Sequence, residues 1–301
     1  MVYDVLVLGA GSAGYTAAIY ASRYKMSVAV IGTEPGGLIN EAHLVENYPG
    51  FVSISGRELT SRFKENIDHL KIPLFQEDIV YLGKSGDLFK VKTDKNEYLA
   101  KTIVLGLGTK RRRLNVEGEE KFAGRGVSYC FTCDAPFYKN KDAVGVVGGN
   151  DSAAMASLLL ADYAKKVYII YRKAKLRAQP VYFDKIKEKG NIEYVYNSNV
   201  VEVFGDQFVE GVKLDTGKEL KVNGLFIEIG QTPSVDLVKE LGVELDDKDY
   251  IKVDSNCETS IPGVYAAGDI TNTPLRQVIV AAGQGAIAAL SAYKYINQVK
   301  K

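Results

Sequence analysis

Two cysteines separated by two residues give this chain its clearest chemical signal. They stand in the run Cys130-Phe131-Thr132-Cys133-Asp134. Thiolates attack disulfides and also bind metals, so such a pair serves redox chemistry or helps to hold an ion. A zinc site needs two more ligands, and the available residues, His43, His69 and Cys257, have no ligand spacing to the pair. The pair therefore favours a redox disulfide and no metal, with two unrelated buried thiols as the alternative.

Length and composition favour two domains. The chain has 301 residues, of which 46% are hydrophobic and 25% charged, enough to bury a large core. Its 38 basic and 37 acidic residues give a net charge of +1, without the basic excess typical of nucleic-acid binding. Residues 1–9 carry an acid within an apolar run, which predicts a strand and not a signal peptide. No run approaches the roughly 20 apolar residues of a membrane span, so we expect a cytoplasmic protein that binds neither nucleic acid nor membrane.

The chain opens with a pattern typical of dinucleotide-binding proteins. A strand, a turn, a helix and a second strand are expected at residues 3–8, 9–14, 15–23 and 27–31, and the turn reads Gly9-Ala10-Gly11-Ser12-Ala13-Gly14. Gly9 permits a tight turn, Gly11 lets backbone N–H groups approach a pyrophosphate, and Gly14 lets the helix pack on the strand. Glu34 lies 20 residues beyond Gly14, where an acid would hold a ribose hydroxyl.

A second unit of the same kind is expected in the middle of the chain. Its strand, turn, helix and strand fall at residues 143–147, 148–153, 154–164 and 166–171, with the turn Gly148-Gly149-Asn150-Asp151-Ser152-Ala153. Asn150 occupies the middle glycine position, where a side chain weakens or reshapes pyrophosphate binding. The basic residues after the last strand suit the 2′-phosphate of NADP; the alternative is a solvated basic turn. They are Arg172, Lys173, Lys175 and Arg177.

Near the end of the chain, an apolar strand over residues 261–267 leads into Gly268-Asp269, and a helix is expected from Val278 to about Ala292. A carboxylate at the end of such a strand is well placed for a bound polyol. By themselves, however, these residues predict only a strand, a turn and a helix, because an Asp after Gly is common in turns.

Taken together, these motifs resemble those of the low-molecular-weight thioredoxin reductases, FAD-dependent disulfide reductases with two nucleotide-binding domains. The resemblance covers nearly the whole chain and is carried by separated motifs in the expected order: residues 9–14, Pro35-Gly36-Gly37, residues 45–50 (Val-Glu-Asn-Tyr-Pro-Gly), residues 130–134, Ala267-Gly268-Asp269 and Arg276-Gln277. It implies an α/β fold of two Rossmann-like, three-layer domains, the second inserted into the first. Residues 1–113 and 245–301 would form the FAD domain, and residues 114–244 an NADP-binding-like domain that carries the cysteine pair, with crossings at 109–114 and 229–244.

The resemblance also implies the site residues and their roles. Cys133 would lie against the flavin as the charge-transfer thiolate, Cys130 would attack the disulfide of thioredoxin or a similar protein, and Asp134 would act as the acid/base, a role that requires burial. A homodimer is implied as well. The residues expected around FAD are Gly9, Gly11, Ser12, Ala13, Gly14, Glu34, Gly36, Gly37, Leu38, Asn47, Gly108, Gly268, Asp269, Arg276 and Gln277. Those expected around NADP are Gly148, Gly149, Asn150, Asp151, Ser152, Ala153, Arg172, Lys173 and Arg177.

The departures from the family pattern concern the electron donor. The family normally has glycine where Asn150 stands, and its 2′-phosphate site commonly begins His-Arg-Arg, whereas here Tyr171-Arg172-Lys173 follows the strand and Arg177 is retained. Lys keeps the charge but lacks the bidentate fork of Arg. NADPH is the predicted donor. The alternatives are reduced ferredoxin, for which the basic run at 110–113 would be a docking patch unless it is merely a solvated hinge, a dithiol oxidase that uses oxygen, and a non-catalytic flavin-binding module.

Overall fold

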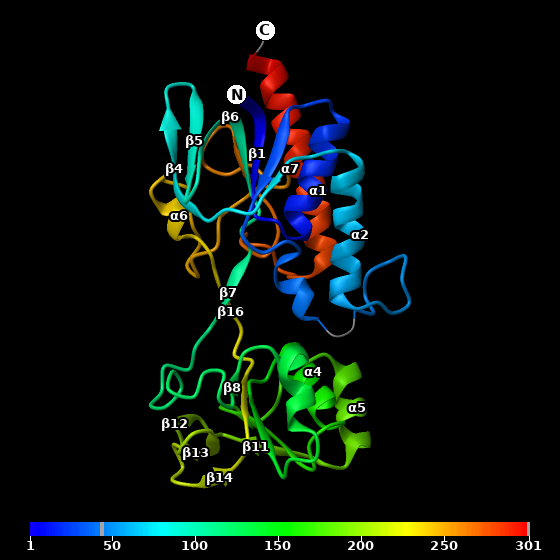
Figure 1. The fold of residues 1–301 in the computed structure, drawn as a ribbon, viewed down its shortest axis with the longest axis vertical. Helices are drawn as coiled ribbons and strands as arrows, with labels where there is room; N and C mark the ends of the chain where they lie inside the picture. Colours follow the sequence, from blue (N-terminus) through cyan, green and yellow to red (C-terminus); the bar gives the residue numbers. More distant parts are fainter. Residues whose placement is uncertain (43–44, 300–301) are drawn as a thin grey trace. The chain divides into compact units, whose positions relative to one another are not determined.

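The computed structural model describes residues 1–42 and 45–299, so His43 lies outside the described residues. The chain forms two compact units, one of Met1–Lys110 with Pro233–Lys301 and the other of Arg111–Thr232 (Figure 1). Residues 233–244, expected in the inserted domain, therefore belong to the first unit. The physical reason is burial: α6 (Asp236–Lys239) and its flanks place Val235, Val238 and Val243 in the apolar core of the first unit.

The first unit is built on a seven-stranded sheet. Its strand order is β3-β2-β1-β6-β5-β4, and β17 also pairs with β6. The strands around β1 run parallel, while β4 and β5 form an antiparallel extension of β6. The strands are β1 (Val2–Leu8), β2 (Val28–Ile31), β3 (Leu74–Phe75), β4 (Ile79–Ser85), β5 (Leu88–Thr93), β6 (Glu97–Leu105) and β17 (Val264–Ala266).

Three helices cover one face of this sheet: α1 (Ser12–Arg23), α2 (Gly56–His69) and α7 (Val278–Val299) (Figure 1). Because side chains alternate along a strand, Val5 and Val7 pack against the helices, while Leu6 and Leu8 join the core on the opposite face. Small side chains let α1 and α7 approach closely: a Cβ on Gly285 would lie 2.2 Å from the carbonyl oxygen of Ala13. This contact brings the end of the chain to the first glycine turn.

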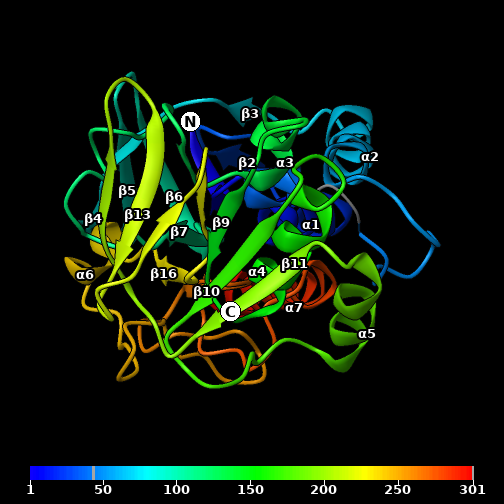
Figure 2. The same ribbon diagram turned by 90° about the horizontal axis from the view of Figure 1, so that it is seen from below.

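The second unit has the same central motif. Its five strands are all parallel, in the order β11-β10-β9-β15-β8, and Figure 2 shows β9, β10 and β11 side by side. Helices α3, α4 and α5 and the short η2 pack on this sheet, and the antiparallel β12-β13-β14 closes another core with β9 and β15. The bounds are β8 (Val127–Ser128), α3 (Phe131–Asp134), η2 (Ala135–Tyr138), β9 (Val144–Val147), α4 (Asp151–Leu160), β10 (Val167–Tyr171), α5 (Pro180–Lys189), β11 (Ile192–Tyr196), β12 (Val200–Gly205), β13 (Val209–Leu214), β14 (Glu219–Lys221) and β15 (Leu225–Ile227).

The two chain crossings pair with each other as a small sheet of β7 (Thr109–Arg111) and β16 (Gln231–Pro233). The predicted α/β class with two Rossmann-like units is confirmed. The expected elements lie within a few residues of their predicted positions, except that α4 ends at Leu160 and α7 extends to Val299. No helix within residues 1–42 and 45–299 combines the length and apolar character needed to cross a membrane.

Candidate functional site

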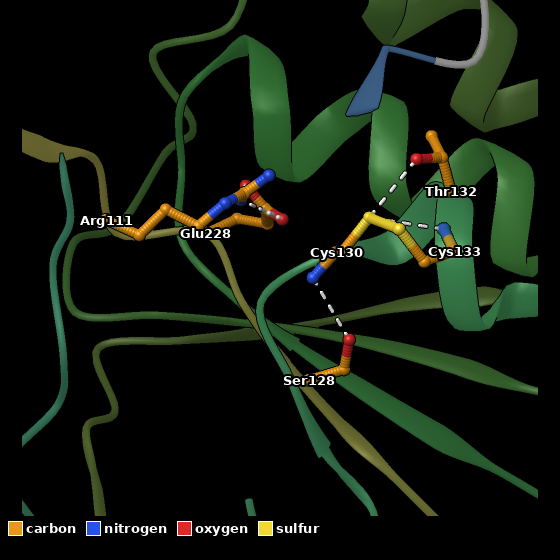
Figure 3. Close-up of a disulfide and its surroundings, with 6 residues drawn as sticks. All are labelled: Arg111, Ser128, Cys130, Thr132, Cys133 and Glu228. Carbon is orange, nitrogen blue, oxygen red and sulfur yellow. Dashed lines mark hydrogen bonds and ion pairs between the residues drawn. A yellow bond between two sulfur atoms is a disulfide. The ribbon is translucent and has the colours of Figure 1, made fainter. Parts of the chain in front are cut away.

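Cys130 and Cys133 form a disulfide in the second unit (Figure 3). Strand β8 ends at Ser128, and the single-turn helix α3 begins at Phe131 with Cys130 as its N-cap. Ser128 fixes the approach to this turn, because its Oγ accepts a hydrogen bond from the backbone N–H of Cys130 at 3.1 Å. The end of a buried strand and one helical turn thus hold both sulfurs at the spacing that the sequence predicts.

The two sulfurs have different surroundings. The Sγ of Cys130 accepts the backbone N–H of Cys133 at 3.3 Å and lies 3.4 Å from Thr132 Oγ1. A disulfide sulfur carries no proton, so the hydroxyl of Thr132 is the donor in that contact. Cys130 is half-buried, while Cys133 is exposed. Donors directed at one sulfur favour the charged form of the thiol that reduction produces there.

Asp134 lies at the end of α3, where its backbone N–H donates to the carbonyl oxygen of Cys130 at 3.2 Å. Its carboxyl group is half-buried, less enclosed than the acid/base role was expected to require. Its charge acts on a neighbour: burial, and after it the carboxylate of Asp134, raises the pKa of Tyr138 to about 12. Tyr138 therefore stays neutral at physiological pH, and Asp134 is the ionisable side chain of this turn.

The first glycine turn has the shape of an anion cradle. Gly9 has φ +110°, and a Cβ there would lie 2.1 Å from the carbonyl oxygen of Gly106, while a Cβ on Gly14 would lie 1.9 Å from that of Gly9. Both positions therefore require glycine. Gly11 differs, because a Cβ there would meet nothing nearer than the Gly36 oxygen at 4.0 Å, and no side chain caps α1. The turn keeps open space in front of uncapped backbone N–H groups, which suits a pyrophosphate.

The loop after β2 lies against this turn. The backbone N–H of Gly36 donates to the carbonyl oxygen of Ala10 at 2.8 Å, and that of Gly37 donates to the carbonyl oxygen of Glu34 at 2.9 Å. The side chain of Glu34 is exposed, as an acid that binds a ribose hydroxyl must be. Leu38 continues the loop in the 3-10 helix η1 (Gly37–Glu41).

Residues from distant parts of the sequence meet near the same turn. Gly268 packs on Ala13, since a Cβ on it would lie 3.1 Å from the Ala13 Cβ. Arg276 lies 3.8 Å from the ring centroid of Tyr250 and donates to the backbone oxygen of Asp269 at 3.4 Å. Burial raises the pKa of Asp269, and Arg276 opposes that shift.

Two other predicted FAD residues are brought together across 230 positions of sequence: Asn47 Nδ2 donates to Gln277 Oε1 at 2.9 Å. Ser12 starts α1 and is half-buried. Gly108 lies apart, beside the crossing, where its carbonyl oxygen accepts the N–H of Ser234 at 3.1 Å. The residues expected around FAD thus come from both segments of the first unit.

The second glycine turn is built differently. Asn150 caps α4, because its Oδ1 accepts the backbone N–H of Ala153 at 3.1 Å. Asp151 accepts the backbone N–H and the Nε2 of Gln179, at 2.7 and 2.6 Å. Gly148 has φ +150°, and Gly149 faces the Tyr171 ring at a distance that leaves no room for a Cβ. Ser152 follows in the first turn of α4.

The basic residues after β10 are exposed at Arg172, Lys173 and Arg177. The backbone of Arg177 is fixed, since its N–H donates to the carbonyl oxygen of Gly149 at 2.6 Å. The segment that carries these charges therefore folds back over the second turn. Sequence reasoning missed this contact, as it missed the contacts of Ser128 and Thr132 with Cys130; the only available signal for the latter two was their spacing of two residues from that cysteine.

Cys257 is a free, buried thiol whose pKa is raised to about 12, by burial and then by the charge of Asp254. Such a thiol is inert, in keeping with the absence of any predicted role. Within the part of the chain that the structure describes, no group of three or more His, Cys, Asp or Glu side chains could hold a metal ion.

Comparison with known proteins places these features in a family. The family model described as pyridine nucleotide-disulphide oxidoreductase matches residues 3–285. A thioredoxin reductase of Listeria monocytogenes is 38% identical over 308 aligned positions, covering 100% of this chain and 96% of that protein. Among solved structures, Lactococcus lactis thioredoxin reductase aligns with a TM-score of 0.94 at 35% identity, covering 98% of this chain and 99% of the other. The T. acidophilum thioredoxin reductase aligns with a TM-score of 0.91 at 39% identity, covering 99% of both chains.

Proposed function

This chain belongs to the pyridine nucleotide-disulphide oxidoreductase family, and we propose that it is a thioredoxin reductase that binds FAD and reduces thioredoxin through Cys130 and Cys133. The observation that carries the proposal is the Cys130–Cys133 disulfide at the start of α3. It is a redox pair with unequal sulfurs, in a chain whose relatives are thioredoxin reductases over their full length.

The first unit supplies the FAD site. The open space at Gly11, the uncapped end of α1 and the acid at Glu34 fit the pyrophosphate and a ribose of a dinucleotide. Asp269, Arg276 and the Asn47–Gln277 pair would hold the rest of the cofactor. Bound FAD would supply the two electrons that, with two protons, convert the disulfide to two thiols.

Reduced Cys130 then acts as the nucleophile. Its thiolate is stabilised by the hydroxyl of Thr132 and the N–H of Cys133. It attacks one sulfur of the thioredoxin disulfide, which forms a mixed disulfide and releases the other thioredoxin sulfur as a thiolate. Asp134 donates the proton that this thiolate takes up. The Cys133 thiolate next attacks the Sγ of Cys130, which releases the second thioredoxin thiol and restores the internal disulfide.

NADPH is the donor that the basic residues Arg172, Lys173 and Arg177 favour, and the family description names a pyridine nucleotide. A cytoplasmic homodimer completes the proposal. The fit of NADPH depends on the side chains around Gly149.

The nucleophile is tested with a single-cysteine thioredoxin that carries thionitrobenzoate on its sulfur. In the reduced, FAD-loaded Cys133→Ser variant, Cys130 releases about one coloured thionitrobenzoate per enzyme and remains joined to thioredoxin. The matched Cys130→Ser variant releases it far more slowly. The reverse pattern contradicts the assignment of the two sulfurs.

A second measurement tests the overall reaction. Enzyme reduced by dithionite under anaerobic conditions, and freed of excess reductant, should convert oxidised thioredoxin to its dithiol. A flavoprotein that yields no thioredoxin thiols in this experiment is a binding module and not a reductase.

A further inference from the structure

The two glycine turns of this chain can be compared position by position. In the first unit, the N–H of Gly9 donates to the carbonyl oxygen of Ile31 at 2.7 Å; in the second, the N–H of Gly148 donates to that of Ile170 at 3.0 Å. This shared contact fixes the register between the units. Gly11 corresponds to Asn150, Ala10 to Gly149, and Gly32, the residue after β2, to Tyr171.

Asn150 differs from Gly11 in its side chain and hardly at all in its backbone. Gly11 has φ −86° and ψ −172°, and Asn150 has φ −101° and ψ −175°. Since neither conformation requires glycine, glycine in the first turn keeps space open. In the second turn the amide of Asn150 enters the corresponding space, and its Oδ1 accepts the backbone N–H of Ala153, a group that a pyrophosphate would otherwise use.

Tyr171 fills the space beside the second turn. A Cβ on Gly149 would lie 2.4 Å from its ring atoms, so the ring lies flush against the backbone of the turn. The ring is buried in a cluster with Leu176 and Ala178, and the N–H of Arg177 holds this segment to Gly149. In the first unit the corresponding residue is Gly32, which has no side chain.

We infer that Asn150 and Tyr171 close the pyrophosphate position of the second unit and are the residues that make NADPH a weakly bound ligand of this chain. The inference rests on the proposed function for its importance, since it concerns the donor of that reaction. It does not concern the exposed charges of Arg172, Lys173 and Arg177, which still suit a 2′-phosphate but have no anchored dinucleotide to act on.

The ring of Tyr171, and not its hydroxyl, does the closing. Within residues 1–42 and 45–299, the hydroxyl is buried without a hydrogen-bond partner, a state that costs free energy. Tyr171→Phe removes the hydroxyl and keeps the ring, and is the matched control. Asn150→Gly is compatible with the fold, because glycine is accepted at an N-cap and already occupies the same position and conformation in the first unit.

The experiment measures NADP⁺ binding to the FAD-loaded oxidised enzyme by calorimetry, in the wild type, Asn150→Gly, Tyr171→Phe and Asn150→Gly/Tyr171→Ala. We expect Asn150→Gly to bind NADP⁺ about tenfold tighter or more, since a backbone N–H regains a charged acceptor. The double variant should bind tighter still, and Tyr171→Phe should bind like the wild type. Anaerobic bleaching of the flavin by NADPH should accelerate in the same order.

Equal NADP⁺ affinity in the wild type and Asn150→Gly would overturn the inference. Should the double variant fail to fold, Asn150→Gly decides the matter alone. Thioredoxin reduction by the dithionite-reduced wild type is measured in parallel. If it succeeds while the NADP⁺ affinities are equal, the proposed function stands and this inference fails; if it fails, the proposed function is wrong whatever the affinities are.

Discussion

Transferring the second turn's asparagine to the first turn tests why Gly11 is glycine. Gly11→Asn should leave the fold intact and remove most of the affinity for FAD. The backbone at Gly11, with φ −86° and ψ −172°, is the one that Asn150 adopts in the same chain. The new Cβ would meet nothing nearer than the Gly36 oxygen at 4.0 Å. The substitution therefore adds a side chain without straining the protein.

The magnitudes follow from what that side chain would contact. As an N-cap, asparagine exceeds glycine by only a few tenths of a kcal/mol, so the free energy of unfolding of the FAD-free protein should be unchanged or slightly raised. A hydrogen bond to a charged group contributes about 1.5–3 kcal/mol. Losing one such bond from α1 to the pyrophosphate should weaken FAD binding about tenfold to about 150-fold.

The assay measures both quantities on one preparation. Urea unfolding of the FAD-free protein gives stability, and the quenching of flavin fluorescence gives the FAD dissociation constant. Gly217→Asn is the matched control, because Gly217 has φ +81°, which asparagine tolerates, and no neighbour within 4 Å of an added Cβ. Gly14→Ala should behave in the opposite way and lose stability, since its Cβ would lie 1.9 Å from the Gly9 oxygen. FAD affinity within twofold of the wild type in Gly11→Asn would refute the reasoning.

Two further predictions concern the thiols. Thr132→Val should raise the pKa of the reduced Cys130 thiol and slow its alkylation by iodoacetamide below that pKa, because the hydroxyl 3.4 Å from the sulfur is lost; Thr132→Ser should restore the wild-type pH profile, and an unshifted Thr132→Val profile would show that the hydroxyl is only structural. Cys257 should resist alkylation in the folded protein at pH 7–9 and react only on unfolding, because its burial raises its pKa to about 12; mass spectrometry of the labelled peptide would reveal any native-state modification.

Much of the fold follows from local patterns that the sequence displays. Strands β1 and β9 are apolar runs that end in glycine turns, and α1 and α4 begin immediately after those turns. Each of these signals lies within about thirty consecutive residues, so the two Rossmann-like units could be predicted without long-range information. The position of the second boundary could not, because residues 233–244 join the first unit through buried contacts of Val235, Val238 and Val243 with a distant sheet.

The candidate site divides in the same way. The sequence by itself determined the residue types that carry the chemistry: the cysteine pair, the glycines that only a missing Cβ can satisfy, and the asparagine in the second turn. Only the tertiary structure decided their surroundings, namely which sulfur receives the hydroxyl of Thr132, that Asn47 meets Gln277, and that the ring of Tyr171 covers Gly149. The physical reason is that residue type and spacing fix what a side chain can do, whereas its hydrogen-bond donors, burial and free space come from segments that only folding brings beside it.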